Sequence, residues 1–248
     1  MRRLFVPPEQ LLAKDAAGLV LLSAAQARHV QVLRLGEGAA LELFDGAGGR
    51  FSAELRAGPE GPVARVIAEL PRPAAGARVQ VTLAQALCKA DKLELVIQKA
   101  CELGVERVVP FAAERSVVRV DADRAEAKVE RWRRIAQEAA RQWGRADVPE
   151  VEAPSSFEAL LARAVAGKDV RAVLLDTGEV PLKLSQAVRG AEQLLLAVGP
   201  EGGFSPRERA QAEGAGFLVA SLGGLVLRTE TAGLAALAVV RHLAGELG

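Results

Sequence analysis

Residues 77–248 alternate between short apolar runs and longer segments with helical spacing, and this alternation constrains the fold more than any other feature of the sequence. The apolar runs at 79–84, 105–110, 172–176, 193–198 and 217–222 are typical of strands. Helices are predicted at 89–103, 124–143, 157–166, 206–215 and 231–247. Strands and helices that follow one another in this way predict an α/β layer with a mostly parallel sheet.

Residues 1–70 show a different pattern, in which short apolar segments are separated by turns. The segments 19–22, 40–44, 51–56 and 63–70 are predicted strands. One helix is expected after Ser23, because Ser23 and Gln26 have the spacing of a capping box. Proline and glycine interrupt the chain at 71–76. We therefore expect a small β-barrel-like domain at 1–70, a linker at 71–76 and an α/β domain at 77–248.

Composition and the first residues exclude several classes of protein. No apolar run reaches the ~18 residues of a membrane-spanning helix, and MRRLFVPPEQ lacks the apolar core of ~7–15 residues that a signal peptide needs. We expect a cytoplasmic protein without a membrane partner. No metal site is expected, because Cys88 and Cys101 lack zinc-site spacing and His29 and His242 lie far apart. The net charge of +1 does not by itself indicate a nucleic-acid partner.

Two of the predicted strands end at glycine-rich turns. The run 193–198 leads into Gly-Pro-Glu-Gly-Gly at 199–203, and a helix is expected to begin at Ser205. The run 217–222 leads into a glycine pair, followed by Arg228 and Glu230 at the start of the last helix. Ligands of parallel sheets bind beyond the carboxyl ends of the strands, which predicts a crevice between these turns and the loop near residue 176. Plain strand–helix connections, with a surface pair of Arg228 and Glu230, are the alternative interpretation.

Neither glycine-rich turn has the spacing of a phosphate-binding P-loop or of the dinucleotide fingerprint. A nucleophile elbow of the Gly-x-Ser-x-Gly type is also absent from the sequence. The predicted helix at 124–143 ends in an arginine-rich stretch, in which Arg141 and Arg145 have no obvious acidic partner. They could bind phosphates, or they could form a solvated charged face.

Taken in order along the chain, these motifs resemble the small-subunit ribosomal RNA methyltransferase E family. This family belongs to the SPOUT superfamily of knotted, S-adenosylmethionine-dependent RNA methyltransferases. The resemblance covers nearly the whole chain. Its motifs are MRRLFV at 1–6, His29 followed by VLR at 32–34, QALCKADKLE at 85–94, QKACELG at 98–104, ERS at 114–116, RW at 131–132, EAARQ at 138–142, GR at 144–145, GPEGGF at 199–204 and LRTETA at 227–232.

The resemblance implies a fold, a reaction and partners. Residues 1–70 would form a PUA-like RNA-binding β-barrel, and residues 77–248 an α/β trefoil-knot domain in which the C-terminal segment passes through a loop. The chain would act as a homodimer. It would transfer the methyl group of S-adenosylmethionine to N3 of a uridine in 16S ribosomal RNA or in the small ribosomal subunit.

The resemblance also implies roles for individual residues. Arg228 would stabilise the negative charge that develops on the uridine, and Glu230 is a candidate proton acceptor. Phosphate contacts with RNA are expected from Arg2, Arg3, Arg34, Lys89, Lys99 and Arg145. The cofactor would be bound by Leu175, Val198, Gly199, Pro200, Glu201, Gly202, Leu222, Gly223, Leu227, Thr231 and Ala232.

The chain departs from the family pattern at three positions. Leu225 stands where an arginine is common, Cys88 where a proline is usual, and Trp143 where a small residue is usual. Three other functions stay open on the sequence: a SPOUT enzyme that modifies another RNA position or the ribose, a catalytically silent RNA-binding or assembly factor, and a generic nucleotide-binding α/β protein.

Overall fold

The computed structural model describes residues 2–71, 79–118, 122–143, 147–167, 169–178 and 180–247. These residues form two compact units. The first is Met1–Ala75 with Gln137–Val148, and the second is Gly76–Ala136 with Pro149–Gly248. Most of the predicted linker, at 72–76, lies outside the described residues. The sequence did not predict that the segment from 137 to 148 groups with the first unit, because it continues a helix of the α/β region.

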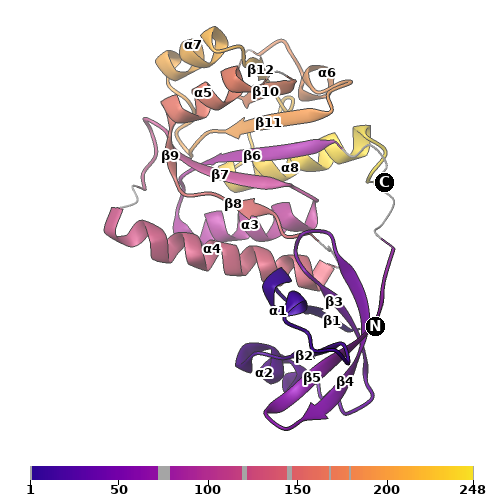
Figure 1. The fold of residues 1–248 in the computed structure, drawn as a ribbon. Helices are drawn as coiled ribbons and strands as arrows, with labels where there is room; N and C mark the ends of the chain where they lie inside the picture. Colours follow the sequence, from indigo (N-terminus) through magenta and orange to yellow (C-terminus); the bar gives the residue numbers. More distant parts are fainter. Residues whose placement is uncertain are drawn as a thin grey trace. The chain divides into compact units, whose positions relative to one another are not determined.

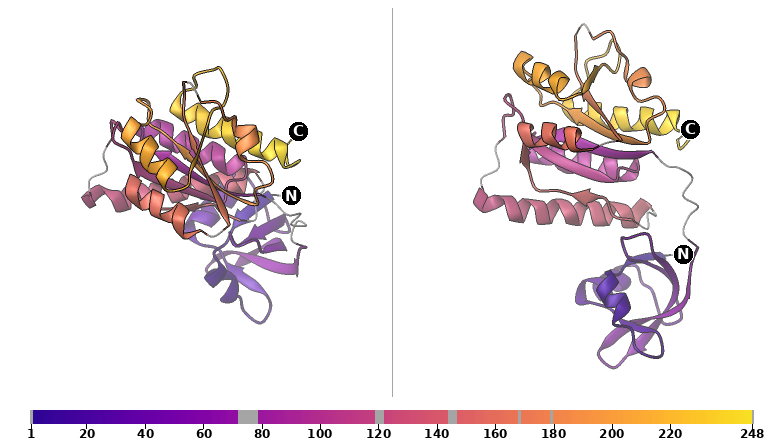
Figure 2. Two further views of the ribbon diagram at one scale, coloured as in Figure 1. Left: turned by 90° about the horizontal axis from the view of Figure 1, so that it is seen from above. Right: turned by 45° about the horizontal axis from the view of Figure 1, so that its top comes forward.

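The first unit contains a five-stranded sheet in the order β1-β3-β4-β5-β2, which curves on itself in the right-hand view of Figure 2. Its strands are β1 (Arg2–Phe5), β2 (Leu19–Leu21), β3 (Ala40–Phe44), β4 (Arg50–Gly58) and β5 (Gly61–Glu69). β1 pairs with β3 in parallel, whereas the other pairs are antiparallel. The mainly β character expected for this region is confirmed.

Two helices accompany this sheet, α1 (Pro8–Leu12) and α2 (Ala24–Val32). The predicted capping box is present at α2: the backbone N–H of Gln26 donates to Ser23 Oγ at 3.3 Å, and the N–H of Ser23 donates to Gln26 Oε1 at 2.7 Å. The sequence analysis missed β1 and α1. β1 has only four residues and includes two arginines, and α1 is a single short helix that starts at Pro8.

The second unit is built on a parallel sheet in the order β12-β10-β11-β6-β7-β8, with β9 paired to β7 (Figure 1). The strands are β6 (Gln80–Ala86), β7 (Arg107–Ala112), β8 (Glu150–Val151), β9 (Ser155–Ser156), β10 (Val170–Leu175), β11 (Gln193–Val198) and β12 (Leu218–Ala220). All of the described pairings are parallel. The predicted parallel α/β layer is therefore confirmed.

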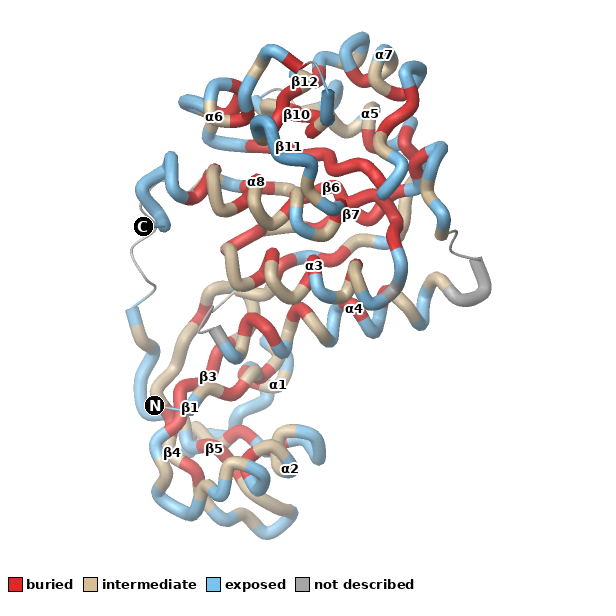
Figure 3. The backbone as a smooth tube through the Cα atoms, turned by 180° about the vertical axis from the view of Figure 1, so that it is seen from behind, coloured by how far each residue is buried: buried red, intermediate tan, exposed pale blue. Residues whose placement is uncertain are grey.

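Helices cover both faces of this sheet. They are α3 (Ala90–Glu102), α4 (Ala122–Trp143), α5 (Phe157–Ala166), α6 (Leu184–Ala187), α7 (Pro206–Gly214) and α8 (Thr229–Leu243). Successive residues of β6 point to opposite faces. Ala84 and Ala86 join a core cluster with Phe157 of α5, whereas Leu83 and Gln85 face α8. The central strands are buried along most of their length (Figure 3).

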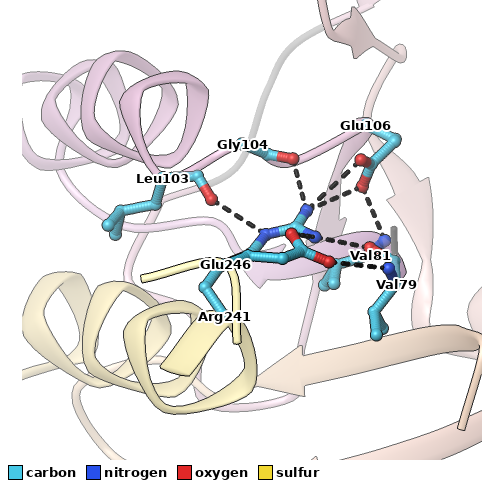
Figure 4. A network of polar contacts seen from close by, with 7 residues as sticks. All are labelled: Val79, Val81, Leu103, Gly104, Glu106, Arg241 and Glu246. Carbon is cyan, nitrogen blue, oxygen red and sulfur yellow. Dashed lines mark hydrogen bonds and ion pairs between the residues drawn. The ribbon is translucent and has the colours of Figure 1, made fainter. Parts of the chain in front are cut away.

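Helix α8 packs beside α3 and against β11 and β6, and Arg241 fastens its carboxyl end (Figure 4). The Arg241 side chain is only 3% exposed. It donates to three backbone carbonyl oxygens, which are those of Leu103 at 3.0 Å, Val79 at 2.5 Å and Gly104. It also pairs with two carboxylates, those of Glu106 at 3.1 Å and Glu246 at 2.8 Å. This network joins the last helix to the segments that precede β6 and β7. None of the described helices is long and apolar enough to cross a bilayer.

Candidate active site

A cavity of about 560 Å³ lies at the carboxyl edge of the parallel sheet in the second unit. Its walls come from the loops that follow β10, β11 and β12, with Lys92 of α3. This volume is within the range of about 300–1,000 Å³ that is common for small-molecule pockets. The position agrees with the rule that ligands bind beyond the carboxyl ends of parallel strands.

Thr229, the first residue of α8, ties the two glycine-rich turns together. Its hydroxyl donates to the carbonyl oxygen of Gly199 at 2.6 Å and accepts from Gln85 Nε2 at 2.8 Å. Thr229 is 5% exposed and Gln85 is fully buried. Three segments that are distant in sequence therefore meet at the floor of the cavity, through hydrogen bonds shielded from water.

Gly233 allows α8 to approach β6 this closely. A Cβ atom at position 233 would lie 3.1 Å from Gln85 Oε1 and 3.4 Å from a methyl carbon of Leu83. The first of these distances is tighter than nearly all Cβ contacts in proteins. The missing side chain thus lets the helix start, with Thr229, reach the end of β11.

The turn at 199–204 is also held from the side away from α8. Arg115 Nη1 donates to the carbonyl oxygen of Gly202 at 3.0 Å. Ser205 Oγ donates to Glu114 Oε2 at 2.7 Å, and Ser205 caps α7 in a box with Glu208. The turn is therefore fixed by the segment that follows β7, which leaves its backbone facing the cavity.

The structure brings most of the predicted cofactor residues to one cavity. The lining includes Leu175, Val198, Gly199, Pro200, Glu201, Leu222, Gly223, Leu227 and Ala232. Gly202 and Thr231 are not among the described residues of the lining, and their role in cofactor binding stays a prediction. A Cβ atom at Gly202 would lie 3.2 Å from Arg115 Cβ and so faces the supporting segment. Thr231 is exposed on the first turn of α8.

The two predicted catalytic residues occupy different settings. Arg228 is exposed, lines the cavity and stands at the N-cap position of α8. Glu230 is not part of the described lining; its side chain is 13% exposed, and Oε2 lies 3.2 Å from Lys92 Nζ. Burial acts to raise the pKa of the Glu230 carboxyl, but its own backbone N–H, Lys92 and Arg228 outweigh burial and lower this pKa. A carboxylate with a lowered pKa is a weaker proton acceptor than a free glutamate, and the expected role of Glu230 as a base stays a prediction.

Lys92 is the site residue that sequence reasoning missed. Its ammonium lies 3.1 Å from Glu201 Oε1 and 3.2 Å from Glu230 Oε2, and these contacts raise its pKa. The sequence contained one indirect signal for this region. The strands 79–84 and 193–198 were predicted for one parallel sheet, so the segments that follow them should lie at the same edge. The structure pairs these strands, β6 and β11, in parallel. The lining also includes residues that were not named individually, although several lie in the predicted turns and in the loop near residue 176: Asp176, Thr177, Gly178, Gly203, Phe204, Gly224, Leu225, Val226 and Thr229.

The predicted RNA-contact residues differ in their exposure and in their partners. Arg2, Arg34 and Lys89 are exposed, whereas Arg145 lies outside the described residues. Lys99 is paired with Glu102 at 2.7 Å and is partly exposed.

Arg3 is less accessible than the other predicted RNA contacts. Its guanidinium lies 2.7 Å from Glu42 Oε1 and over the ring of Phe44, and its side chain is 13% exposed. Arg50 contacts the same carboxylate at 2.8 Å. Arg3 therefore helps to neutralise a buried carboxylate in the first unit, and its contact with RNA stays a prediction.

Comparison with known proteins decides the family. Residues 76–241 match the family model of the RNA methyltransferase domain, and residues 22–67 match that of the RNA methyltransferase PUA domain. The ribosomal RNA small subunit methyltransferase E of Bacillus subtilis is 32% identical, over 98% of this chain and 96% of that protein. The chain belongs to the ribosomal RNA small subunit methyltransferase E family. The family member from Synechocystis is 35% identical, over 97% of this chain and 77% of that protein.

Solved structures of the same family agree. A Neisseria gonorrhoeae ribosomal RNA small subunit methyltransferase E bound to S-adenosyl methionine superposes with a TM-score of 0.85, at 30% identity and 98% coverage of both chains. A Legionella pneumophila methyltransferase in complex with the same cofactor gives a TM-score of 0.84, at 32% identity, over 97% of this chain and 96% of that chain. The expected fold class, enzyme class and cofactor are confirmed. The knotted passage of the C-terminal segment stays a prediction.

The cavity of this chain fits that cofactor. S-adenosylmethionine combines a flat aromatic ring system, whose faces pack against apolar side chains, with a charged amino-acid group. The lining offers apolar side chains such as Pro200, Leu222 and Leu227, and charged groups of both signs on Lys92 and Glu201. In the second turn, Gly223 and Gly224 carry no side chain that would keep a ligand from the backbone, and a Cβ atom at either position would meet no atom within 4 Å.

Proposed function

We propose that this protein transfers the methyl group of S-adenosylmethionine to N3 of a uridine in 16S ribosomal RNA of the small subunit. The observation that carries the proposal is the hydrogen bond from Thr229 to the Gly199 carbonyl, because it brings both glycine-rich turns to one cavity. Arg228 lies at the edge of that cavity. The family relationship supports a ribosomal RNA substrate, because the curated relatives are named for the small ribosomal subunit.

The cofactor supplies an electrophilic methyl group when it is bound. We assign its binding to the two turns, with Gly199, Glu201, Leu222 and Leu227 among the contacts. N3 lies on the pairing edge of uridine, so the base must be unpaired or extruded to reach the cavity. Holding the two reactants in line accounts for much of the rate enhancement in such a transfer.

Arg228 has the position and the charge to act on the uridine. As N3 loses its proton, negative charge develops on the base, and the Arg228 guanidinium at the edge of the cavity would stabilise that charge. Glu230 instead holds Lys92 and stays ionised. We therefore assign catalytic contact with the substrate to Arg228 alone.

We further propose that residues 1–70 form the RNA-binding domain, that 71–76 are a linker and that 77–248 form the catalytic domain. Arg2, Arg34 and Lys89 are exposed cations with the chemistry to contact RNA phosphates, which makes binding dependent on salt. We propose that the enzyme works as a homodimer in the cytoplasm, where ribosomal subunits are assembled. Sedimentation at low protein concentration tests the dimer, which should have twice the mass of the chain.

The product tests the reaction. Small-subunit RNA is incubated with enzyme and S-adenosylmethionine, and the modified nucleoside is mapped by mass spectrometry; 3-methyluridine is expected. A 2′-O-methyl product would show a different SPOUT reaction. Absence of calorimetric binding to S-adenosylhomocysteine would instead favour a silent RNA-binding or assembly factor.

Arg228→Ala tests the assigned role. We expect kcat to fall by about 100-fold or more, as for other lost charge-stabilising groups. Affinity for S-adenosylhomocysteine and the unfolding midpoint should stay close to wild type. Arg228→Lys, which keeps the charge but loses the planar fork, should recover part of the rate. A wild-type rate in Arg228→Ala would refute the assignment.

A further inference from the structure

Lys92 connects the two walls of the cavity from a third element. It lies in the first turns of α3, whereas Glu201 belongs to the turn after β11 and Glu230 to the first turn of α8. Its ammonium lies 3.1 Å from the first carboxylate and 3.2 Å from the second. The exposed fractions of the three side chains are 23% for Lys92, 33% for Glu201 and 13% for Glu230. The cluster is therefore partly shielded from water.

Without this cation, two negative charges would face each other at the edge of the cavity. Like charges in a partly buried setting repel, and burial adds to the free-energy cost of each ionised carboxylate. The charged groups that act on Glu230 are Lys92 and Arg228, while Glu230, Glu201, Lys92 and Asp91 all act on the nearby Cys88 thiol. Burial, followed by the charge of Glu201, raises the pKa of the Cys88 thiol to about 12, so this group is neutral and offers no compensation. Arg228 acts on Glu230, but Lys92 contacts both carboxylates.

The same two walls are thus joined at two depths. At the floor, the Thr229 hydroxyl binds Gly199 through a buried neutral hydrogen bond. At the edge, the connection is ionic and in contact with solvent. The hydrogen bond from Thr229 to Gly199 fixes the distance between the two turns at the floor. The contacts of Lys92 with Glu201 and Glu230 limit the distance between the same segments at the solvent-exposed edge.

We propose that Lys92 is a positioning residue that holds the turn at 199–204 and the start of α8 at the separation that the cofactor requires. This inference rests on the proposed function, because it assumes that S-adenosylmethionine occupies the cavity. It predicts that cofactor affinity depends on the positive charge at position 92, through Glu201 and Glu230.

Calorimetry with S-adenosylhomocysteine at pH 7.5 tests the charge dependence. Lys92→Met keeps the side-chain length but removes the charge, and we expect binding about tenfold weaker than wild type, as for a partly buried ion pair that loses one partner. Lys92→Arg should bind within about threefold of wild type, because it restores the cation.

Arg131→Met is the matched control. Arg131 Nε lies 2.7 Å from Glu94 Oε1 and also joins α3 to another helix, but it is not among the described residues of the cavity lining. This variant should bind like wild type.

Two rescues distinguish positioning through the carboxylates from a general structural role. In Lys92→Met, one of the facing carboxylates should take up a proton as the pH falls from 7.5 to 5.5, so binding should recover, whereas wild-type affinity should change little. Adding Glu230→Gln to Lys92→Met removes the repulsion at pH 7.5 and should restore most of the affinity. This double variant also serves if Lys92→Met alone does not fold.

The outcomes are separable. If wild type does not bind S-adenosylhomocysteine, the proposed function fails, and this inference fails with it. If wild type binds and Lys92→Met binds equally well, only the role of Lys92 is overturned. It is also overturned if binding is lost and neither acid nor Glu230→Gln restores it, because Lys92 would then act without the carboxylates.

Discussion

Replacing Thr229 with valine tests whether the floor of the cavity depends on a single hydroxyl. Valine has the same shape as threonine but cannot donate or accept a hydrogen bond. The change leaves the Gly199 carbonyl without its 2.6 Å donor and Gln85 Nε2 without its 2.8 Å acceptor. Gln85 is fully buried, so water cannot replace its lost acceptor, and Thr229 itself is only 5% exposed.

The expected magnitude follows from these two losses. Each buried polar group left without a partner costs about 1–3 kcal/mol, so Thr229→Val should lower the free energy of unfolding by about 2–6 kcal/mol. That is a large part of the roughly 5–15 kcal/mol that stabilises a typical domain. Cofactor affinity should fall as well, because the two walls lose their connection.

Urea unfolding measures the change. The chain has two tryptophans, and Trp132 is buried in the second unit. Its fluorescence in a Trp143→Phe background therefore follows the unit that contains the cavity. Thr229→Ser is the control, since it keeps the hydroxyl and should stay within about 1 kcal/mol of the parent. A loss below about 0.5 kcal/mol in Thr229→Val, with unchanged binding of S-adenosylhomocysteine, would refute the reasoning.

Two further predictions concern charges away from the cavity. Arg241→Met should lower the free energy of unfolding by about 3–5 kcal/mol, because it leaves Glu106 and Glu246 without their buried cation. Urea unfolding measures this change. Arg241→Lys should recover only part of the lost stability. The Arg50 hydrogen bond is the main cause that lowers the pKa of Glu42. The stability it provides is fully present above the unfolded-state pKa of about 4.3 and is lost as the pH falls through the lower folded-state pKa. Wild type should therefore lose more stability than Glu42→Gln between about pH 5 and pH 3, as measured by urea unfolding at each pH.

Local patterns in the sequence were sufficient to predict elements of the parallel sheet and the helices that flank it. The predicted strand 193–198 and helix 157–166 coincide with β11 and α5, and the predicted helix start at Ser205 is present with its capping box. These elements have strong local signals: a continuous apolar run, helical spacing and a serine cap. Because both glycine-rich turns follow parallel strands, their common edge of the sheet could also be predicted.

Contacts between distant segments could not be predicted in the same way. Lys92 and Glu201 are 109 positions apart, and no spacing in the sequence connects them. Arg3 was assigned to RNA from the family resemblance, and β1 was not predicted; because β1 pairs with β3, Arg3 stands directly opposite Glu42. The resemblance did not indicate this partner, and only the strand register revealed it.

The empty space at position 233 has a consequence for how the cavity can vary between related sequences. Gly233 lies one helical turn after Thr229, and its missing Cβ leaves room for Gln85 and Leu83. A single methyl group there requires either the Gln85 side chain or α8 to shift by a few tenths of an ångström. If α8 shifts, the Thr229 hydroxyl moves relative to Gly199, so a residue outside the lining influences the width of the cofactor cavity. A homologue with alanine at this position and smaller side chains at 83 or 85 would keep the same separation.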